Sequence, residues 1–361
     1  MSRIVTVYSS SLRPARQVEM GHIRWYRMSA ALAALGHSVD IASAELSRRV
    51  FRTAETIAPN LRIVPISRVR WSDYDVVKTL FHSGFETLER YGGANHPFVI
   101  AKLGSVVGAT DMEGVFFYGR QREAMHRVQE RIAHSSRFVT LLSEPAVDLW
   151  RSTHGTASRT LLVPGAASAV IPPPRRNPYV HDGRSPVVFA GNFYSTHPQS
   201  QPKAHQTLAT KLNQLGALLH RRGSRLYVVG AGEHRSLDPR YVSYCGTVPY
   251  EASWDYIHFA AVGIVLTAGG RMHNNESTKI YHYLRAGLPV VSEAGFPNDN
   301  VVSESGLGHI VENGNLEMIA QRVEESLHTP WDRDRAIRYI LSRHTWERRA
   351  EIYDRLLRGS E

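Results

Sequence analysis

The segment with the strongest chemical signal covers residues 274–291, which read NNESTKIYHYLRAGLPVV. A helical pattern follows its polar first residues, so Ser277 and Thr278 fall where a helix is capped, and Lys279 adds a full charge in the first turn. Backbone N–H groups and the helix dipole then point out of the loop, an arrangement that suits an anion such as a diphosphate. An ordinary capped helix with a solvated lysine fits the same residues.

Composition limits the partners and the compartment. The 361 residues favour two domains. The formal net charge of +10 favours negatively charged partners: nucleotides, phospholipid head groups, polyprenyl phosphates or nucleic acid. Cys245 is the single cysteine, which excludes an intramolecular disulfide framework and a Cys-based zinc cluster. No signal-peptide core or spanning segment is recognisable, so we expect a cytoplasmic protein, free or peripheral on the inner membrane face.

The proline distribution divides the chain. Six of the 18 prolines lie within residues 164–186, and proline fits neither a helix interior nor a central strand. We therefore expect an extended linker over residues 166–185. On each side, short β-branched runs alternate with helical segments, which predicts an α/β protein with two doubly wound Rossmann-like domains, 1–165 and 186–342, facing a cleft. A basic terminal helix, about 343–361, is expected to pack back on the first domain.

The expected elements follow from hydrophobic periodicity and turn residues. Before the linker we expect strands over 3–8, 38–42, 61–65, 76–79, 98–102, 138–142 and 160–163, with helices over 23–35, 84–91, 119–133 and 144–153. After the linker we expect strands over 186–190, 226–229, 242–246, 263–266, 289–291 and 309–311, with helices over 204–222, 250–260, 277–286 and 316–327. Helix-forming residues run on over 335–357.

Several blocks, taken in order, resemble glycosyltransferases of the GT-B architecture, which have two Rossmann-like domains, and among them the bacterial polysaccharide type. TKIYHYLRAGLPVV is similar to their nucleotide-binding segment, and the other matching blocks are 21–42, 187–192, 227–232, 242–265 and 345–357. The resemblance implies sugar transfer from a nucleotide-diphosphate sugar, expected to be UDP-linked, to a glycan, lipid-linked or small-molecule acceptor. It implies no metal and no cofactor, because a helix start and a lysine carry the diphosphate charge.

By position, the resemblance assigns the donor to the second domain. The donor-binding residues that it implies are Gly191, Asn192, Lys203, Val248, Gly269, Gly270, Arg271, Glu276, Ser277, Thr278, Lys279 and His282. Glu276 or His282 would meet the ribose, although His282 equally fits a partly buried helix residue. Asn192 stands where an arginine is frequent in the family. A plain flexible turn explains Gly269 and Gly270 as well as a sugar contact does.

The chain departs from the best-known retaining members, which carry two glutamates at the positions of Asn274 and His282. Lys279 and Tyr283 make the segment more similar to inverting exopolysaccharide enzymes. We therefore expect inversion, which needs a general base on the first domain near the acceptor hydroxyl.

Asp111 is our candidate for that base, because its loop directly follows the strand over 98–102. Glu113 is the substitute, and His22, which titrates near neutral pH, is a second contender. The alternatives are a turn or helix-capping role for Asp111 and a backbone hydrogen bond for His22. Arg24 would bind an acceptor phosphate or sugar carboxylate, or lie exposed on its helix.

Other charged patterns carry less information. Asp-x-Asp strings at 73–75 and 332–334 lie beside a strand and in a charged stretch, so we do not assign a metal to them. The arginine-rich residues 119–137 fit a solvated helix face or contact with an anionic membrane surface. Two other function classes stay open. One is a non-catalytic nucleotide-binding module, and the other is a nucleic-acid-binding protein, which only the charge favours, so no nucleic-acid partner is expected.

Overall fold

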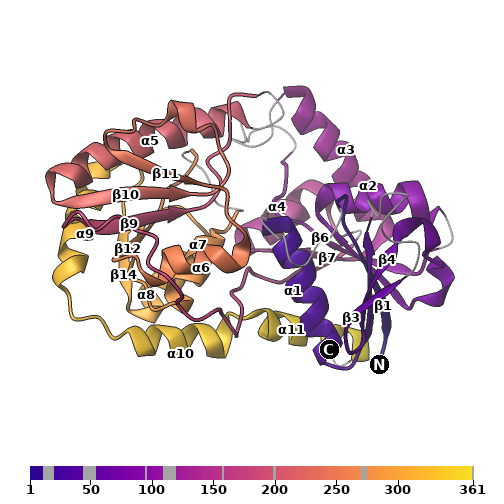
Figure 1. Cartoon of the computed structure of the whole chain (residues 1–361). Coiled ribbons are helices and arrows are strands. Elements are labelled where there is room, and N and C mark those ends of the chain that lie inside the picture. The colour runs from indigo at the N-terminus through magenta and orange to yellow at the C-terminus, as the bar shows by residue number, and fades with distance from the viewer. Residues whose placement is uncertain are drawn as a thin grey trace. The chain divides into compact units, whose positions relative to one another are not determined.

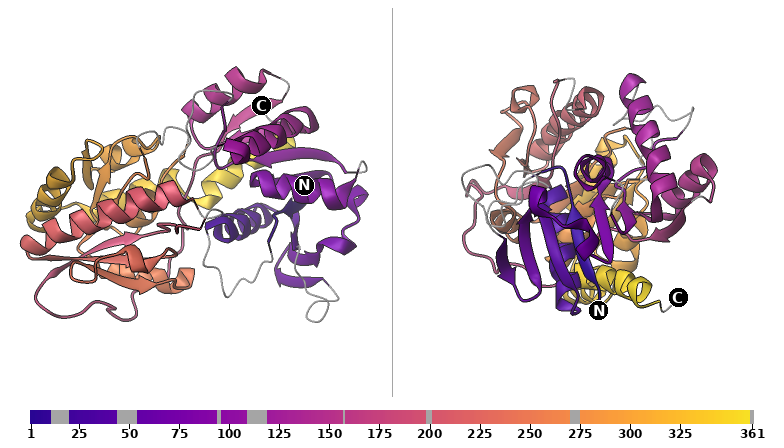
Figure 2. Two further views of the ribbon diagram at one scale, coloured as in Figure 1. Left: turned by 90° about the horizontal axis from the view of Figure 1, so that it is seen from above. Right: turned by 90° about the vertical axis from the view of Figure 1, so that its right-hand side faces the viewer.

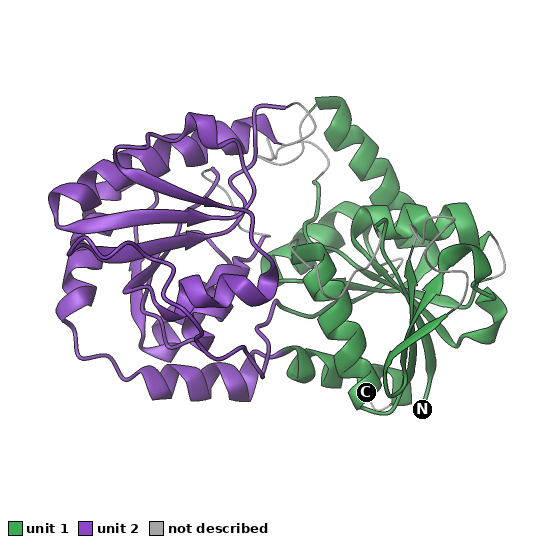
Figure 3. Cartoon of the chain, viewed as in Figure 1, with its two compact units in different colours: residues 1–112, 118–164, 346–361 green, residues 113–117, 165–345 purple. Residues whose placement is uncertain are grey.

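The computed structural model describes residues 1–10, 20–43, 54–93, 96–108, 119–156, 158–197, 201–269 and 275–359 (Figure 1). Within these residues the chain forms two compact units (Figure 3). Unit 1 contains the described residues up to Pro164 together with those from Trp346 onward, and unit 2 contains Gly165–Thr345. Each unit is built around its own sheet.

Unit 1 has a sheet in the strand order β3-β4-β2-β1-β5-β6-β7-β8, parallel throughout except that β3 runs antiparallel to β4. Its strands are β1 (Arg3–Val7), β2 (Ser38–Ser43), β3 (Glu55–Ala58), β4 (Leu61–Pro65), β5 (Val76–Leu80), β6 (Phe98–Lys102), β7 (Ser136–Leu141) and β8 (Arg159–Leu162). Its helices are α1 (Met20–Ala34), η2 (Ile66–Arg68), η3 (Trp71–Asp73), α2 (Phe81–Gly92), α3 (Gly119–Ser135), α4 (Glu144–His154) and α11 (Trp346–Arg358).

Unit 2 has a fully parallel sheet in the order β11-β10-β9-β12-β13-β14. Its strands are β9 (Ser185–Ala190), β10 (Ser224–Val229), β11 (Val242–Gly246), β12 (Val262–Val265), β13 (Val290–Glu293) and β14 (Gly308–Val311). Its helices are α5 (Pro202–Arg221), η5 (His234–Ser236), α6 (Tyr250–His258), α7 (Thr278–Arg285), α8 (Asp299–Ser305), α9 (Leu316–His328) and α10 (Arg333–Arg343).

Helices cover both faces of each sheet (Figures 1 and 2). In unit 1, α1 packs against α11 on one face, and α2 packs against α3 on the other. In unit 2, α5 and α9 form one layer, and α7, α8 and α10 form the opposite one. Coverage of both faces explains why the central strands are almost continuously apolar. None of the described helices is long and apolar enough to cross a bilayer.

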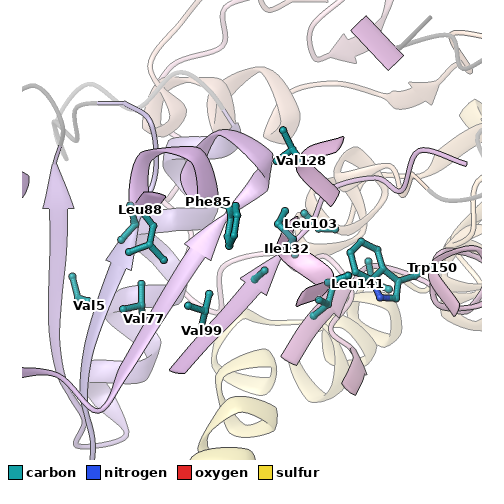
Figure 4. Close-up of a cluster of buried hydrophobic side chains, with 14 of the residues drawn as sticks. Val5, Val77, Phe85, Leu88, Val99, Leu103, Val128, Ile132, Leu141 and Trp150 are labelled. Carbon is teal, nitrogen blue, oxygen red and sulfur yellow. The ribbon is translucent and has the colours of Figure 1, made fainter. Parts of the chain in front are cut away.

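The core of unit 1 shows how this burial is achieved. Val5, Val77 and Val99 come from the neighbouring strands β1, β5 and β6, and all three are fully buried (Figure 4). Phe85 of α2 and Trp150 of α4 pack into the same cluster. Side chains of this size are worth about 1.5–3 kcal/mol each when buried, so helices and strands stabilise one another through this face.

The alternation of strands and helices predicted from the sequence is confirmed, and the differences have tertiary causes. Strand β3 and helix α8 are not among the predicted elements, because both are short and have no clear hydrophobic period. The helix-forming residues over 335–357 do not form one continuous helix, because α10 ends at Arg343 and α11 begins at Trp346. Thr345 between them pairs with Ala167, whose N–H donates to the carbonyl of His344. That pairing removes these two residues from a continuous helix.

The proline-rich stretch is extended, as its composition predicts, but it is packed on unit 2. Tyr179 is buried, and its hydroxyl donates to the carbonyl of Tyr256 in α6. His258 of α6 hydrogen-bonds the carbonyl of Pro172, and the N–H of Arg175 donates to the carboxylate of Asp255. The stretch is therefore fixed along α6 by side-chain contacts that proline spacing does not encode.

Candidate functional site

Strands β9 and β12 lie side by side in the sheet of unit 2. The chain continues from β9 to β10 and β11 on one side, and from β12 to β13 and β14 on the other. In doubly wound sheets, ligands bind outside the carboxyl ends of the strands at such a reversal. Gly191 directly follows β9, and Gly269 lies shortly after β12. Two of the predicted donor-binding glycines therefore lie at this edge.

Helix α7 is fixed to that edge through residues one turn apart. The hydroxyl of Tyr283 accepts a hydrogen bond from the N–H of Ala190 at 2.7 Å, and Tyr283 is fully buried. A Cβ atom on Gly263 of β12 would lie 2.5 Å from the Tyr283 ring, so a glycine is needed for this approach. Lys279, four residues earlier on the same face, therefore reaches the end of β9.

The Lys279 side chain lies directly against Gly191. A Cβ atom on Gly191 would be 2.2 Å from Cε of Lys279 and 2.6 Å from Nζ. The ammonium also lies 4.6 Å from the centroid of the Phe189 ring, a cation–π distance. Burial lowers the pKa of Lys279 to about 8. Among the described residues, no carboxylate forms an ion pair with it. This half-buried cation can therefore accept an anionic ligand, which would favour its charged form.

The start of α7 is held by Asn298, which the sequence analysis missed. Ser277 is at the N-cap position, as predicted, but its side chain makes no capping hydrogen bond. Instead its N–H donates to Oδ1 of Asn298 at 3.0 Å, and its carbonyl accepts from Nδ2 of Asn298 at 2.9 Å. Ser277 is 6% exposed, and its Oγ has no hydrogen-bond partner within the part of the chain that the structure describes. That hydroxyl can donate to a ligand at the helix start.

Glu276 and His282, the two predicted ribose contacts, are both buried. Oε2 of Glu276 accepts from the N–H of Gly165 at 2.5 Å, and Oε1 accepts from the hydroxyl of Tyr281 at 2.8 Å. The His282 ring lies 5.3 Å from that of Trp254 in α6. These contacts explain both residues structurally, and a ribose contact by either one stays a prediction.

The other predicted donor residues lie on separate loops and helix ends of unit 2. Lys203 is exposed at the second position of α5. Asn192 is exposed, and its Oδ1 accepts from the N–H of Tyr194. Val248 is half-buried between β11 and α6. Thr278 is buried at the first position of α7.

A buried ion pair braces the same edge of the sheet, and no sequence motif pointed to it. Glu293 at the end of β13 is fully buried, and its Oε1 lies 2.7 Å from Nζ of Lys211 in α5. Its Oε2 accepts from both the N–H and the hydroxyl of Thr267. Lys211 also donates to Oδ1 of Asn313. This network fixes Thr267, and with it the backbone just before Gly269.

In unit 1, His22 and Arg24 lie near the carboxyl end of β1. Helix α1 begins at Met20, so His22 is in the helix and not in a preceding loop, as the sequence analysis expected. Its Nε2 is 2.7 Å from Oγ of Ser10, and its ring lies 5.8 Å from that of Tyr8. Arg24 is half-buried on the same helix.

Five residues singled out in the sequence analysis lie outside the described residues. They are Asp111, Glu113, Gly270, Arg271 and Asn274. The assignment of Asp111 as the base, with Glu113 as its substitute, therefore stays a prediction. Among the described residues, no group of three or more His, Cys, Asp or Glu side chains could hold a metal ion.

Several solved structures share the fold of this chain over almost their whole length. Sucrose-phosphate synthase from Thermosynechococcus elongatus superposes with a TM-score of 0.74 at 15% identity, covering 99% of each chain. The chain has the GT-B fold. A UDP-forming α,α-trehalose-phosphate synthase from Burkholderia xenovorans, in complex with glucose-6-phosphate, gives 0.67 at 9% identity over 99% of each chain. HepE from Anabaena, in complex with UDP, gives 0.65 at 11% identity over 99% of this chain and 100% of that chain.

The predicted pair of Rossmann-like domains is confirmed by these similarities, which at such identities concern the fold. No protein-family model and no curated protein matches the sequence.

Proposed function

We propose that the protein is a glycosyltransferase that moves a sugar from a UDP-linked donor to a glycan, lipid-linked or small-molecule acceptor. The single observation that carries the proposal is Lys279, which lies against Gly191 at the carboxyl end of β9 without a carboxylate partner among the described residues. The solved structures of this fold add support, because two of them are trehalose-phosphate synthase (UDP-forming) and a protein in complex with UDP.

In the proposed donor complex, the diphosphate binds at the start of α7. The ammonium of Lys279 and the hydroxyl of Ser277 donate to phosphate oxygens, and Gly191 lets the backbone come close. Thr278, Asn192, Lys203 and the segment 269–271 complete the phosphate and sugar contacts. Val248 contacts the nucleotide base of the donor, and Glu276 or His282 contacts its ribose.

The proposed transfer inverts the configuration at the anomeric carbon. A base on unit 1 removes the proton of the acceptor hydroxyl while its oxygen forms a bond to the anomeric carbon, and the bond from that carbon to the diphosphate breaks. Asp111 is the proposed base, with Glu113 or His22 in its place if it fails, and Arg24 binds the acceptor. The leaving UDP carries the negative charge, which the start of α7 and Lys279 stabilise without a metal.

The donor assignment is tested by thermal shift and calorimetry with UDP, GDP and ADP. UDP should give the largest stabilisation, and Lys279→Ala should weaken UDP binding about 10- to 150-fold. Arg240→Gln is the matched control, because Arg240 is exposed and forms its ion pair with Asp238, two residues earlier in the same turn. If UDP stabilised Lys279→Ala as much as the wild-type protein, the assignment of the donor site to the start of α7 would be wrong.

Catalysis is tested with a panel of UDP-sugars and acceptors in the presence and absence of EDTA. Release of UDP that is unchanged by EDTA is expected, and UDP binding without hydrolysis or transfer of any donor would favour a non-catalytic nucleotide-binding module. Asp111→Asn should lower transfer by at least 100-fold with UDP affinity unchanged. Unchanged turnover would end the assignment of Asp111.

The membrane contact is a separate part of the proposal. Arg120 and Arg127 are exposed on α3, the helix whose composition suggested an anionic surface. Binding of the protein to phosphatidylglycerol vesicles that weakens with salt and with Arg120→Gln/Arg127→Gln would support a peripheral location.

A further inference from the structure

Unit 1 contains a cavity that lies away from the edge used by the proposed acceptor. Its volume is about 670 Å³, and it is bounded by the last turn of α4, the beginning of β8 and the last turns of α11. A second hollow of about 480 Å³ shares Phe138, Arg159 and Leu356 with it and extends along the beginnings of β5 and β6. Together they form one groove at the amino ends of the strands, opposite the carboxyl ends where His22 lies. A volume of this size is typical of small-molecule sites.

The rim of the groove is strongly basic. Arg137 from β7, Arg151 from α4, Arg159 from β8 and Arg355 from α11 all line it, and all four are exposed. Within the described part of the chain, no carboxylate forms an ion pair with Arg137, Arg151 or Arg355. Asp75 is the acidic residue of the lining, and it accepts a hydrogen bond from the N–H of Arg3. The rim therefore carries an excess of positive charge.

Helix-dipole neutralisation accounts for only part of this cluster. Arg151 and Arg355 lie in the last turns of α4 and α11, where cations are ordinarily favourable. Arg137 and Arg159 lie on strands, and their guanidinium groups stack near the Phe138 ring, at 5.8 and 6.0 Å from its centroid. Arg151, Arg159 and Arg355 thus line the larger cavity, and Arg137 lines the second hollow beside it.

Beside buried Ser158 and half-buried Thr160, the groove has an apolar floor. Its half-buried side chains come from the edge strand and the end of the C-terminal helix, and they are Leu161, Ile352, Leu356 and Leu357. An inorganic anion would satisfy the arginines and leave this floor in water, whereas an uncharged hydrocarbon would do the reverse. A ligand that fits both parts has an anionic head and one hydrocarbon chain.

We propose that this groove binds a single-chain amphiphile with a phosphate head group, its chain on the apolar floor and its phosphate on the arginine rim. The site is independent of the proposed sugar transfer, since its residues belong to unit 1 and none of them is assigned to donor or acceptor.

The test uses isothermal titration of the full chain with dodecyl phosphate below its critical micelle concentration. Saturable binding that weakens with added salt is expected. Decyl phosphate should bind about ten-fold more weakly than dodecyl phosphate, and octyl phosphate about ten-fold more weakly again, because each lacks two more methylene groups to bury on the floor. Equally tight binding of dodecyl maltoside would mean that the phosphate group is not recognised, and equally tight binding of inorganic phosphate would mean that the hydrocarbon chain is not. Either result would overturn the proposal.

A pair of variants locates the binding. Arg151→Gln/Arg355→Gln should weaken dodecyl phosphate at least ten-fold. Arg68→Gln/Arg90→Gln, which removes the same charge from exposed positions of η2 and α2 outside the groove, should change it less than two-fold. An equal loss of dodecyl phosphate affinity in both double variants would mean that the protein attracts the anion through its overall charge and has no specific site in the groove. Leu356→Ser tests the floor separately: it should flatten the chain-length dependence while the salt dependence stays. UDP affinity should be the same in all of these variants, so failure here is distinct from failure of the donor site.

Discussion

Gly191→Ala should separate nucleotide binding from folding. The added Cβ would be 2.2 Å from Cε of Lys279, so the end of the lysine must move. That end belongs to a flexible side chain, and Gly191 is not among the residues with positive φ, so an alanine fits the backbone. Holding a side chain off its preferred rotamer costs about 0.5–1.5 kcal/mol, and replacing a glycine returns about 0.4–1 kcal/mol through the unfolded chain. The free energy of unfolding should therefore change by less than about 1 kcal/mol.

The effect on UDP binding should be much larger. A hydrogen bond to a charged group is worth about 1.5–3 kcal/mol, and displacement of the ammonium from the diphosphate loses it. The dissociation constant should rise about 10- to 150-fold. Isothermal titration with UDP measures this rise, and urea unfolding monitors stability in parallel.

The Lys279→Ala background decides the cause. If the added methyl group acts by moving the lysine, Gly191→Ala has less than a two-fold effect once the lysine side chain is gone. The same loss in both backgrounds would mean that the Cβ blocks the ligand itself. No loss in the wild-type background would mean that Lys279 does not touch the ligand, and the reasoning from its contact with Gly191 would be wrong.

Three further outcomes follow from the same edge of unit 2. Because burial lowers the pKa of Lys279 to about 8, the free protein loses this positive charge above pH 8. UDP affinity, measured by isothermal titration, should therefore be full below pH 8 and fall up to ten-fold per pH unit above it. Lys279→Ala should show no such fall. Lys211→Met leaves the fully buried Glu293 without its ion-pair partner, so it should lower the free energy of unfolding, measured in urea, by about 3–5 kcal/mol. The double variant Lys211→Met/Glu293→Gln should regain stability. A double variant as unstable as the single one would contradict a charge effect. Asn298→Ala removes both hydrogen bonds to Ser277, so it should cost about 1–3 kcal/mol of stability and weaken UDP several-fold; unaltered amide exchange at Ser277 would show that Asn298 does not hold it.

The sequence alone determined the layered architecture and the position of α7. Hydrophobic periodicity and helix-start residues are local properties, so they predict an alternation of strands and helices wherever a segment must bury one face. The residues 277–279 mark a helix start for the same reason, and the structure begins α7 at Thr278. The same local logic failed at the C-terminus, where helix-forming residues continue through His344 and Thr345 and only their pairing with Ala167 ends the helix.

The tertiary structure decided what each functional residue touches. Glu276 meets the N–H of Gly165 from 111 positions away, and Glu293 meets Lys211 from 82 positions away. Neither pairing follows from residue types, because it depends on the order of the strands, and a parallel sheet brings together strand ends that are remote in sequence. The contact of Lys279 with Gly191 has the same origin: β12 lies next to β9, so the helix that follows β12 packs its lysine against the end of β9.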